Sequence, residues 1–156
     1  MNRRAFFASC AAALAFADRS AWAKTAAQNP WPPGALIEPA ALVKQLASNG
    51  NSLHVLCVTF PFLYDSKHIP GAQFAGPGRD PEGITKLNAA VKHLPKNASI
   101  VIYCGCCPMK KCPNIRPAYR ALRKDGFRNV RVLDLPTNFY TDWVKKGYPV
   151  ESGKAS

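Results

Sequence analysis

Two kinds of hydrophobic pattern alternate along the chain. Short apolar runs rich in β-branched residues, typical of buried strands, occur at residues 53–59, 99–103 and 130–133. Between them lie longer segments with apolar residues three or four positions apart, which is typical of amphipathic helices. Alternating strands and helices predict an α/β domain with a mostly parallel sheet covered on both faces.

The predicted helices begin and end at residues that favour helix ends. Proline near a helix start costs nothing there, because its missing N–H would have no partner inside the helix. Glycine is the usual residue just beyond a helix end. Helices are predicted from Glu38 to Asn49-Gly50, from Asp80 through Leu94, from Asn114 to about Asp125, and from Thr137 to Gly147. Short extended pieces are predicted at residues 35–37 and 73–75, and an aromatic loop at residues 60–67.

A cysteine-rich loop follows the run at residues 99–103. Backbone N–H groups where a loop meets a helix favour an anion, such as a thiolate, above the strand end. A thiolate is also the nucleophilic form of cysteine, and Cys104 comes first after the strand, so we predict it as the catalytic nucleophile. The predicted substrate-binding residues are Gly105, Cys106, Cys107, Lys110, Lys111 and Arg116.

The first 23 residues have the features of a secretory signal peptide. Arg3 and Arg4 precede a short apolar stretch, and Ala21-Trp22-Ala23 fits the small-residue cleavage pattern. We therefore expect an exported, periplasmic protein with no stable membrane span after signal removal, and both the Sec and the twin-arginine route remain open. The further predicted divisions are a Pro-rich leader at 24–34, one domain at 35–151 and a polar tail at 152–156.

The charge balance favours anionic partners. The 156 residues include 21 Lys and Arg against 9 Asp and Glu, a formal charge of +12. Nucleic-acid binding needs basic residues clustered on one face, whereas here they are spread thinly between Lys86 and Lys154. We expect a small anionic partner and no nucleic acid.

Several segments, in order, resemble the rhodanese-like domain family. They are His68-Ile69-Pro70-Gly71-Ala72, Ile100-Val101-Ile102-Tyr103-Cys104, Ala118 to Leu122, Gly126-Phe127-Arg128-Asn129-Val130, and Trp143 with Gly147-Tyr148-Pro149-Val150. The resemblance implies a three-layer α/β/α fold with a five-stranded, mostly parallel central sheet. It also implies sulfur transfer, in which a Cys104 persulfide carries sulfane sulfur from a donor such as thiosulfate to cyanide or a thiol, including a protein thiol. We expect no cofactor and no metal.

The loop departs from the family pattern by its length and by three additional cysteines, Cys106, Cys107 and Cys112. In an exported protein a structural or redox disulfide is the favoured use of these cysteines, with one of them as a resolving thiol for Cys104. A sulfur relay and a soft-metal site are the alternatives. The alternative function is therefore a non-catalytic, redox or metal-binding module. Cys57, inside a strand, is predicted to be a core residue, and His68 a turn residue.

Overall fold

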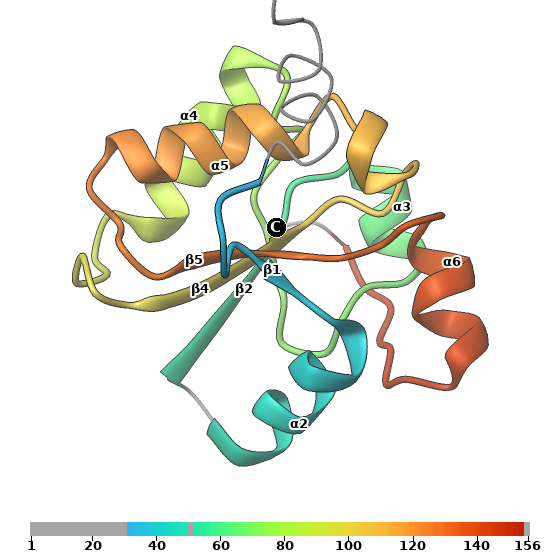
Figure 1. Ribbon diagram of the computed structural model, residues 1–156. Coiled ribbons are helices and arrows are strands. Elements are labelled where there is room, and N and C mark those ends of the chain that lie inside the picture. The colour runs from blue at the N-terminus through green and yellow to red at the C-terminus, as the bar shows by residue number, and fades with distance from the viewer. Residues whose placement is uncertain (1–30, 50–51, 155–156) are drawn as a thin grey trace, which may run out of the picture. The chain divides into compact units, whose positions relative to one another are not determined.

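Five parallel strands form the centre of the domain in a computed structural model that describes residues 31–49 and 52–154 (Figure 1). Their order across the sheet is β1-β5-β4-β2-β3, so β4 lies in the middle. All four neighbouring pairs are parallel. The strands are β1 Leu36–Ile37, β2 Leu53–Cys57, β3 Gln73–Phe74, β4 Ser99–Tyr103 and β5 Val130–Leu133. This confirms the predicted five-stranded α/β fold.

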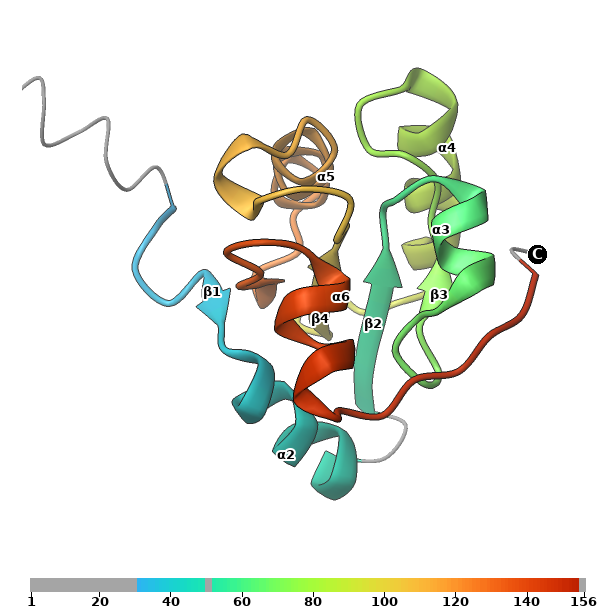
Figure 2. The same ribbon diagram turned by 90° about the vertical axis from the view of Figure 1, so that its right-hand side faces the viewer.

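Helices cover both faces of the sheet. On one face lie α4 and α5, and on the other lie α2 and α6, which gives three layers (Figure 1). The short helix α3 lies beside the end of β2 (Figure 2). The helices are α2 Pro39–Asn49, α3 Pro61–Ser66, α4 Pro81–Val91, α5 Ile115–Lys124 and α6 Phe139–Asp142, with single 3-10 turns η2 Met109–Lys111 and η3 Val144–Lys146.

The central strand β4 supplies both halves of the core. Successive side chains of a strand point to opposite faces of the sheet. Val101 and Tyr103 belong to the apolar cluster that includes Leu42 of α2 and Trp143. Ile100 and Ile102, also buried, therefore face the layer formed by α4 and α5. Because β4 is buried on both faces, the backbone is held firmly at the point where the next residue, Cys104, begins.

Removing a core side chain from α5 is expected to destabilise the fold strongly. Leu122 is completely buried, so Leu122→Ala leaves a cavity and should lower the free energy of unfolding by about 2–5 kcal/mol. Urea denaturation followed by circular dichroism measures this change. Lys124→Ala, on the same helix but exposed, is the control and should change it by less than about 0.5 kcal/mol. Equal effects of the two variants would contradict the described packing of α5.

Three local predictions are corrected by the structure. Residues 61–66 form helix α3, whereas an aromatic loop was predicted; Pro61 occupies the first turn, and six residues are too few to show a helical period. Strand β2 ends at Cys57 and does not continue to Thr59. The cap of α6 is Asn138, whose side chain accepts a hydrogen bond from the Thr141 amide, in place of the predicted Thr137.

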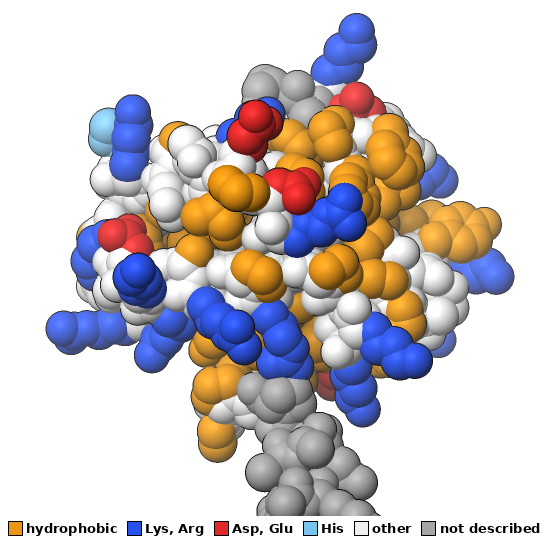
Figure 3. All heavy atoms as spheres, turned by 90° about the horizontal axis from the view of Figure 1, so that it is seen from above, with side chains coloured by type: hydrophobic (Ala, Val, Ile, Leu, Met, Phe, Trp, Pro, Cys, Tyr) orange, Lys and Arg blue, Asp and Glu red, His pale blue; other side chains and the backbone are white. Residues whose placement is uncertain are grey.

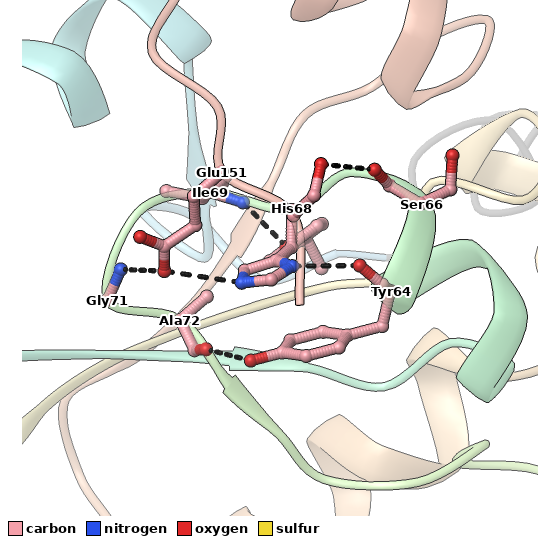
Figure 4. Close-up of polar contacts among 9 residues, drawn as sticks. Tyr64, Ser66, His68, Ile69, Gly71, Ala72 and Glu151 are labelled. Atoms are coloured by element: carbon pink, nitrogen blue, oxygen red, sulfur yellow. Dashed lines mark hydrogen bonds and ion pairs between the residues drawn. The ribbon is translucent and has the colours of Figure 1, made fainter. Parts of the chain in front are cut away.

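His68 ties the end of the chain to the turn before β3 (Figure 4). Its buried ring stacks on Tyr64 with centroids 3.8 Å apart, and Nδ1 lies 2.8 Å from the Tyr64 carbonyl oxygen. Nε2 lies 3.2 Å from a carboxylate oxygen of Glu151, which also accepts from the Gly71 amide. A backbone bridge joins His68 and Glu151. His68 thus has a structural role, in agreement with its prediction as a turn residue.

The C-terminal segment continues past this bridge along α3. The Ser152 hydroxyl donates to the Ser66 carbonyl, and the Gly153 amide donates to that of Asp65. The first residues of the predicted polar tail are therefore hydrogen-bonded to the domain. The predicted signal peptide and residues 24–30 of the leader lie outside the described residues. Within the part of the chain that the structure describes, no helix has the length and apolar character needed to cross a membrane.

Candidate active site

Cys104 lies directly beyond the carboxyl end of the central strand β4. Its side chain is only 5% exposed. The Asn114 side-chain amide donates to its Sγ at 3.2 Å, and the Thr59 hydroxyl lies 3.5 Å from the same atom. Thr59 follows β2 and Asn114 precedes α5, so two neighbouring segments converge on Cys104. Ligands of open parallel sheets bind outside the carboxyl ends of the strands, and Cys104 occupies that position.

The loop turns at Gly105, where the backbone comes very close to α6. Gly105 has φ +79°, a conformation that only glycine adopts without strain. A Cβ atom there would lie 2.4 Å from Cβ of Phe139. The Phe139 amide donates to the Gly105 carbonyl at 3.1 Å, and the Met109 amide donates to the Leu135 carbonyl at 3.0 Å. These contacts fix the position of the loop against α6 and the segment after β5.

Three thiols of this loop form one cluster. The Sγ atoms of Cys104, Cys106 and Cys112 all lie within 4.8 Å of one another. Cys106 Sγ is 3.2 Å from Cys104 Sγ and 3.9 Å from Cys112 Sγ. Cys107 lies at the edge, with its Sγ 3.1 Å from that of Cys106. Sulfur atoms so placed can exchange disulfides, pass a sulfur atom, or bind a soft metal ion such as Cu(I) or Zn²⁺.

The cluster favours the thiolate form of Cys104. Hydrogen bonds from the Cys106 and Cys112 thiols, and from Thr59, hold the pKa of Cys104 well below its ordinary value, although burial opposes them. The same hydrogen bonds to Cys104, together with burial, raise the pKa of Cys106 and that of Cys112. One negative charge is therefore concentrated on Cys104 and held by its neighbours.

This charge distribution predicts the reactivity of Cys104 towards alkylation. Because the pKa is lowered, Cys104 remains a thiolate below neutral pH, and iodoacetamide should label it at nearly the same rate at pH 6 and pH 8. An ordinary thiol with a pKa near 8.5 loses about tenfold in rate per pH unit below that value. Mass spectrometry of the labelled tryptic peptide measures both rates. A roughly hundredfold loss between pH 8 and pH 6 would contradict the assignment.

A pocket opens beside Cys104. It has a volume of about 310 Å³, and its walls include Leu63, Phe139, Tyr140 and Val144, with Lys67 as a cationic group. Cys104, Gly105 and Cys106 also line it. A larger hollow of about 620 Å³, between α2 and β2, contains none of the cysteines. Of these two pockets, the smaller one gives a substrate access to the thiol cluster.

The predicted site residues fall into two groups in the structure. Cys104, Gly105 and Cys106 line the pocket. Lys110 and Lys111 are exposed on η2, and Arg116 is half-buried in the first turn of α5. All five described cysteines are free thiols, so the predicted loop disulfide is not formed in this structure. Cys57 is 1% exposed and burial raises its pKa to about 12, as expected for a core residue.

Sequence reasoning missed the polar partners of Cys104. Asn114 was interpreted only as a helix start, yet it is completely buried, donates to Cys104 Sγ, and accepts from the Arg79 amide at 3.2 Å. The signal in the sequence that could have identified it is an asparagine directly after the cysteine-rich loop. Thr59 gave no such signal, because 45 positions separate it from Cys104 in the chain.

Basic side chains do not form a continuous patch on the face seen from above. There, Lys and Arg side chains lie singly or in small groups, with hydrophobic and uncharged polar groups between them (Figure 3). A nucleic-acid backbone needs a basic stripe or groove along its path. The basic residues of this face therefore do not form such a stripe.

Fold and site together define an α/β protein with a buried cysteine at the carboxyl edge of a parallel sheet. The family model of the rhodanese-like domain matches residues 39–145, and the chain belongs to this family. No curated protein matches the sequence significantly.

Solved structures with the same fold include proteins from several bacteria. The BH2092 protein from Bacillus halodurans is 26% identical, with 74% of this chain and 75% of that chain covered and a TM-score of 0.58. The Alr3790 protein from Anabaena sp. is 23% identical, with 74% and 82% covered and a TM-score of 0.58. Thiosulfate sulfurtransferase from Pseudomonas aeruginosa is 26% identical over 78% of this chain, also with a TM-score of 0.58, and the match spans only 20% of that enzyme.

Proposed function

We propose that this protein is an exported sulfurtransferase whose nucleophile is Cys104. The thiolate attacks the outer sulfur of an anionic donor such as thiosulfate. The S–S bond of thiosulfate breaks, sulfite leaves with its electron pair, and Cys104 keeps the sulfur as a persulfide anion. A thiol or cyanide then attacks the outer sulfur, and Cys104 leaves as a thiolate. No cofactor takes part in either step.

The observation that carries this proposal is the environment of the Cys104 sulfur. The Asn114 side-chain amide donates to it, the Cys106 sulfur lies 3.2 Å away, and it opens onto a pocket. Family membership adds support, and the similar enzyme from Pseudomonas aeruginosa is a thiosulfate sulfurtransferase. Export is supported by the sequence of residues 1–23.

The proposal is tested on protein purified without the signal peptide, reduced and then freed of reductant. Thiosulfate alone is expected to raise the mass by about 32 Da, one sulfur atom, as long as the sulfur stays on Cys104 as a persulfide. Thiosulfate with cyanide is expected to give thiocyanate. The absence of sulfite release, of a persulfide and of thiocyanate would reject the sulfurtransferase function.

A soft-metal site is the second candidate function, and the three-sulfur cluster favours it. Thiolates select Cu(I) and Zn²⁺ over harder ions. Because the cluster includes Cys104, a bound ion and a persulfide would exclude each other. A metal count on protein purified without chelators distinguishes the two: one copper or zinc ion per chain that blocks sulfite release would favour this candidate.

A further inference from the structure

Cys106 Sγ lies 3.2 Å from Cys104 Sγ. Atoms that are about to react lie roughly 3–3.5 Å apart in a productive complex. In a Cys104 persulfide, Sγ keeps its bond to Cβ and becomes the inner sulfur. The distance of 3.2 Å from Cys106 Sγ is therefore a distance to this inner sulfur. The geometry therefore places Cys106 to attack the inner sulfur.

We propose that this protein, besides transferring sulfur, releases it as hydrosulfide, with Cys106 as the resolving thiol. This rests on the proposed function, because a Cys104 persulfide must form first. Cys106 Sγ bonds to Cys104 Sγ, and the bond between Cys104 Sγ and the outer sulfur breaks. The outer sulfur leaves with the electron pair of that bond and takes the proton of Cys106, so that hydrosulfide and a Cys104–Cys106 disulfide form.

The step needs no external oxidant or reductant. The sulfur of Cys106 is oxidised to the disulfide level, the outer sulfur is reduced to sulfide, and one negative charge stands on each side of the equation. A second turnover requires a reducing dithiol to open the disulfide. Dithiothreitol supplies this in the test tube.

The local backbone is compatible with this disulfide. The Cα atoms of residues two positions apart are at most about 7 Å from each other, and disulfides join Cα atoms about 4.4–6.8 Å apart. Gly105, between the two cysteines, adopts φ +79° and turns the chain, so both thiols reach the same side.

Neither of the other loop thiols is placed as well. Cys107 is not part of the group of three thiols whose Sγ atoms all lie within 4.8 Å of one another, and its short contact is with Cys106. Cys112 also contacts Cys104, but it is buried and does not line the pocket beside Cys104, so hydrosulfide formed there would lack the exit that the pocket gives at Cys106. Cys106 is half-buried and lines the pocket, so the hydrosulfide has a way out.

A single-turnover experiment tests this step. Anaerobic, reduced protein without reductant is mixed with one equivalent of thiosulfate, and sulfite, sulfide and intact mass are measured over time. The wild type is expected to release about one equivalent each of sulfite and sulfide and to lose about 2 Da, the mass of two hydrogens. Cys106→Ser removes the thiol that hydrogen-bonds to Cys104, so it is expected to release sulfite more slowly than the wild type. For each equivalent of sulfite it is expected to release at least about tenfold less sulfide and to keep the added sulfur as a stable persulfide.

Peptide mapping identifies the disulfide that forms. Trypsin cuts after Lys96, Lys110 and Lys111, so Cys104, Cys106 and Cys107 lie in one peptide and Cys112 in another. A Cys104–Cys106 disulfide stays within one peptide, whereas a disulfide to Cys112 links two. Cys107→Ser and Cys112→Ser remove the competing thiols one at a time, and both are expected to release sulfide.

The outcomes separate this inference from the proposed function. A wild type that keeps a stable persulfide and releases no sulfide overturns the inference and leaves sulfur transfer intact. Sulfide release that survives in Cys106→Ser but is lost in Cys112→Ser also overturns it. No sulfite and no persulfide in Cys106→Ser reject sulfur transfer itself.

Discussion

The Cys104→Ser variant is expected to lose sulfur transfer almost completely. A serine hydroxyl at neutral pH is neither ionised nor able to hold a sulfane sulfur as a persulfide. The polar partners of Cys104, among them Asn114 and Thr59, remain in place and cannot substitute for the nucleophile. Thiocyanate formation from thiosulfate and cyanide should therefore fall by at least about 10³-fold, as is usual when a covalent nucleophile is removed.

The control for this variant removes a thiol outside the loop. Cys57 is a core residue of β2, and Cys57→Ala should keep most of the activity. Circular dichroism and thermal denaturation must show that Cys104→Ser is folded, which the exchange of one atom favours. If Cys104→Ser kept its activity while Cys112→Ser lost it, Cys112 would be the nucleophile and the assignment made from the end of β4 would be wrong.

Gly105→Ala is expected to damage both the site and the fold. The new Cβ would lie 2.4 Å from Cβ of Phe139, so the loop or α6 must move. The positive φ adds backbone strain of about 1–2 kcal/mol. A shift of about 1 Å at a reacting group can cost about 10²-fold in rate, and a loss of this size is expected in the rate of sulfite release.

Gly71→Ala separates backbone strain from the clash. Gly71 has φ +73°, nearly the same as Gly105, but a Cβ there meets no atom within 4 Å. It should lower the melting temperature through strain alone and leave the rate of sulfite release unchanged. If the two variants reduced that rate equally, the close approach of Gly105 to Phe139 would not be what positions the loop.

The sequence was sufficient for the framework because the framework depends on local periodicity. The β-branched run of β4 and the apolar spacing of α5 are each visible within a few residues, and both elements form as predicted. Helix α3 was missed because its one and a half turns are too short to show a helical hydrophobic period. Its proline and aromatic residues were interpreted as a loop.

The site was only partly predictable because its parts come from distant segments. Cys104 and Cys106 could be identified from their own spacing. Thr59 and Phe139 reach the site from other elements, and nothing in their local sequence indicates it. Lys110 and Lys111 were predicted as substrate-binding residues from their charge. The charge of a residue does not show which way its side chain points, and in the structure both side chains are exposed.

The position of Cys104 at the end of β4 also has a consequence for hydrogen exchange. Amides of a central strand, paired on both sides, exchange only when the whole domain opens, whereas amides of a half-exposed loop exchange through small local openings. The boundary between these regimes falls within three residues, between Tyr103 and Cys106. Cys104 thus follows directly on the slowest-opening part of the molecule, whereas Cys106, the thiol proposed to release the sulfur, belongs to a loop that can open without unfolding the domain.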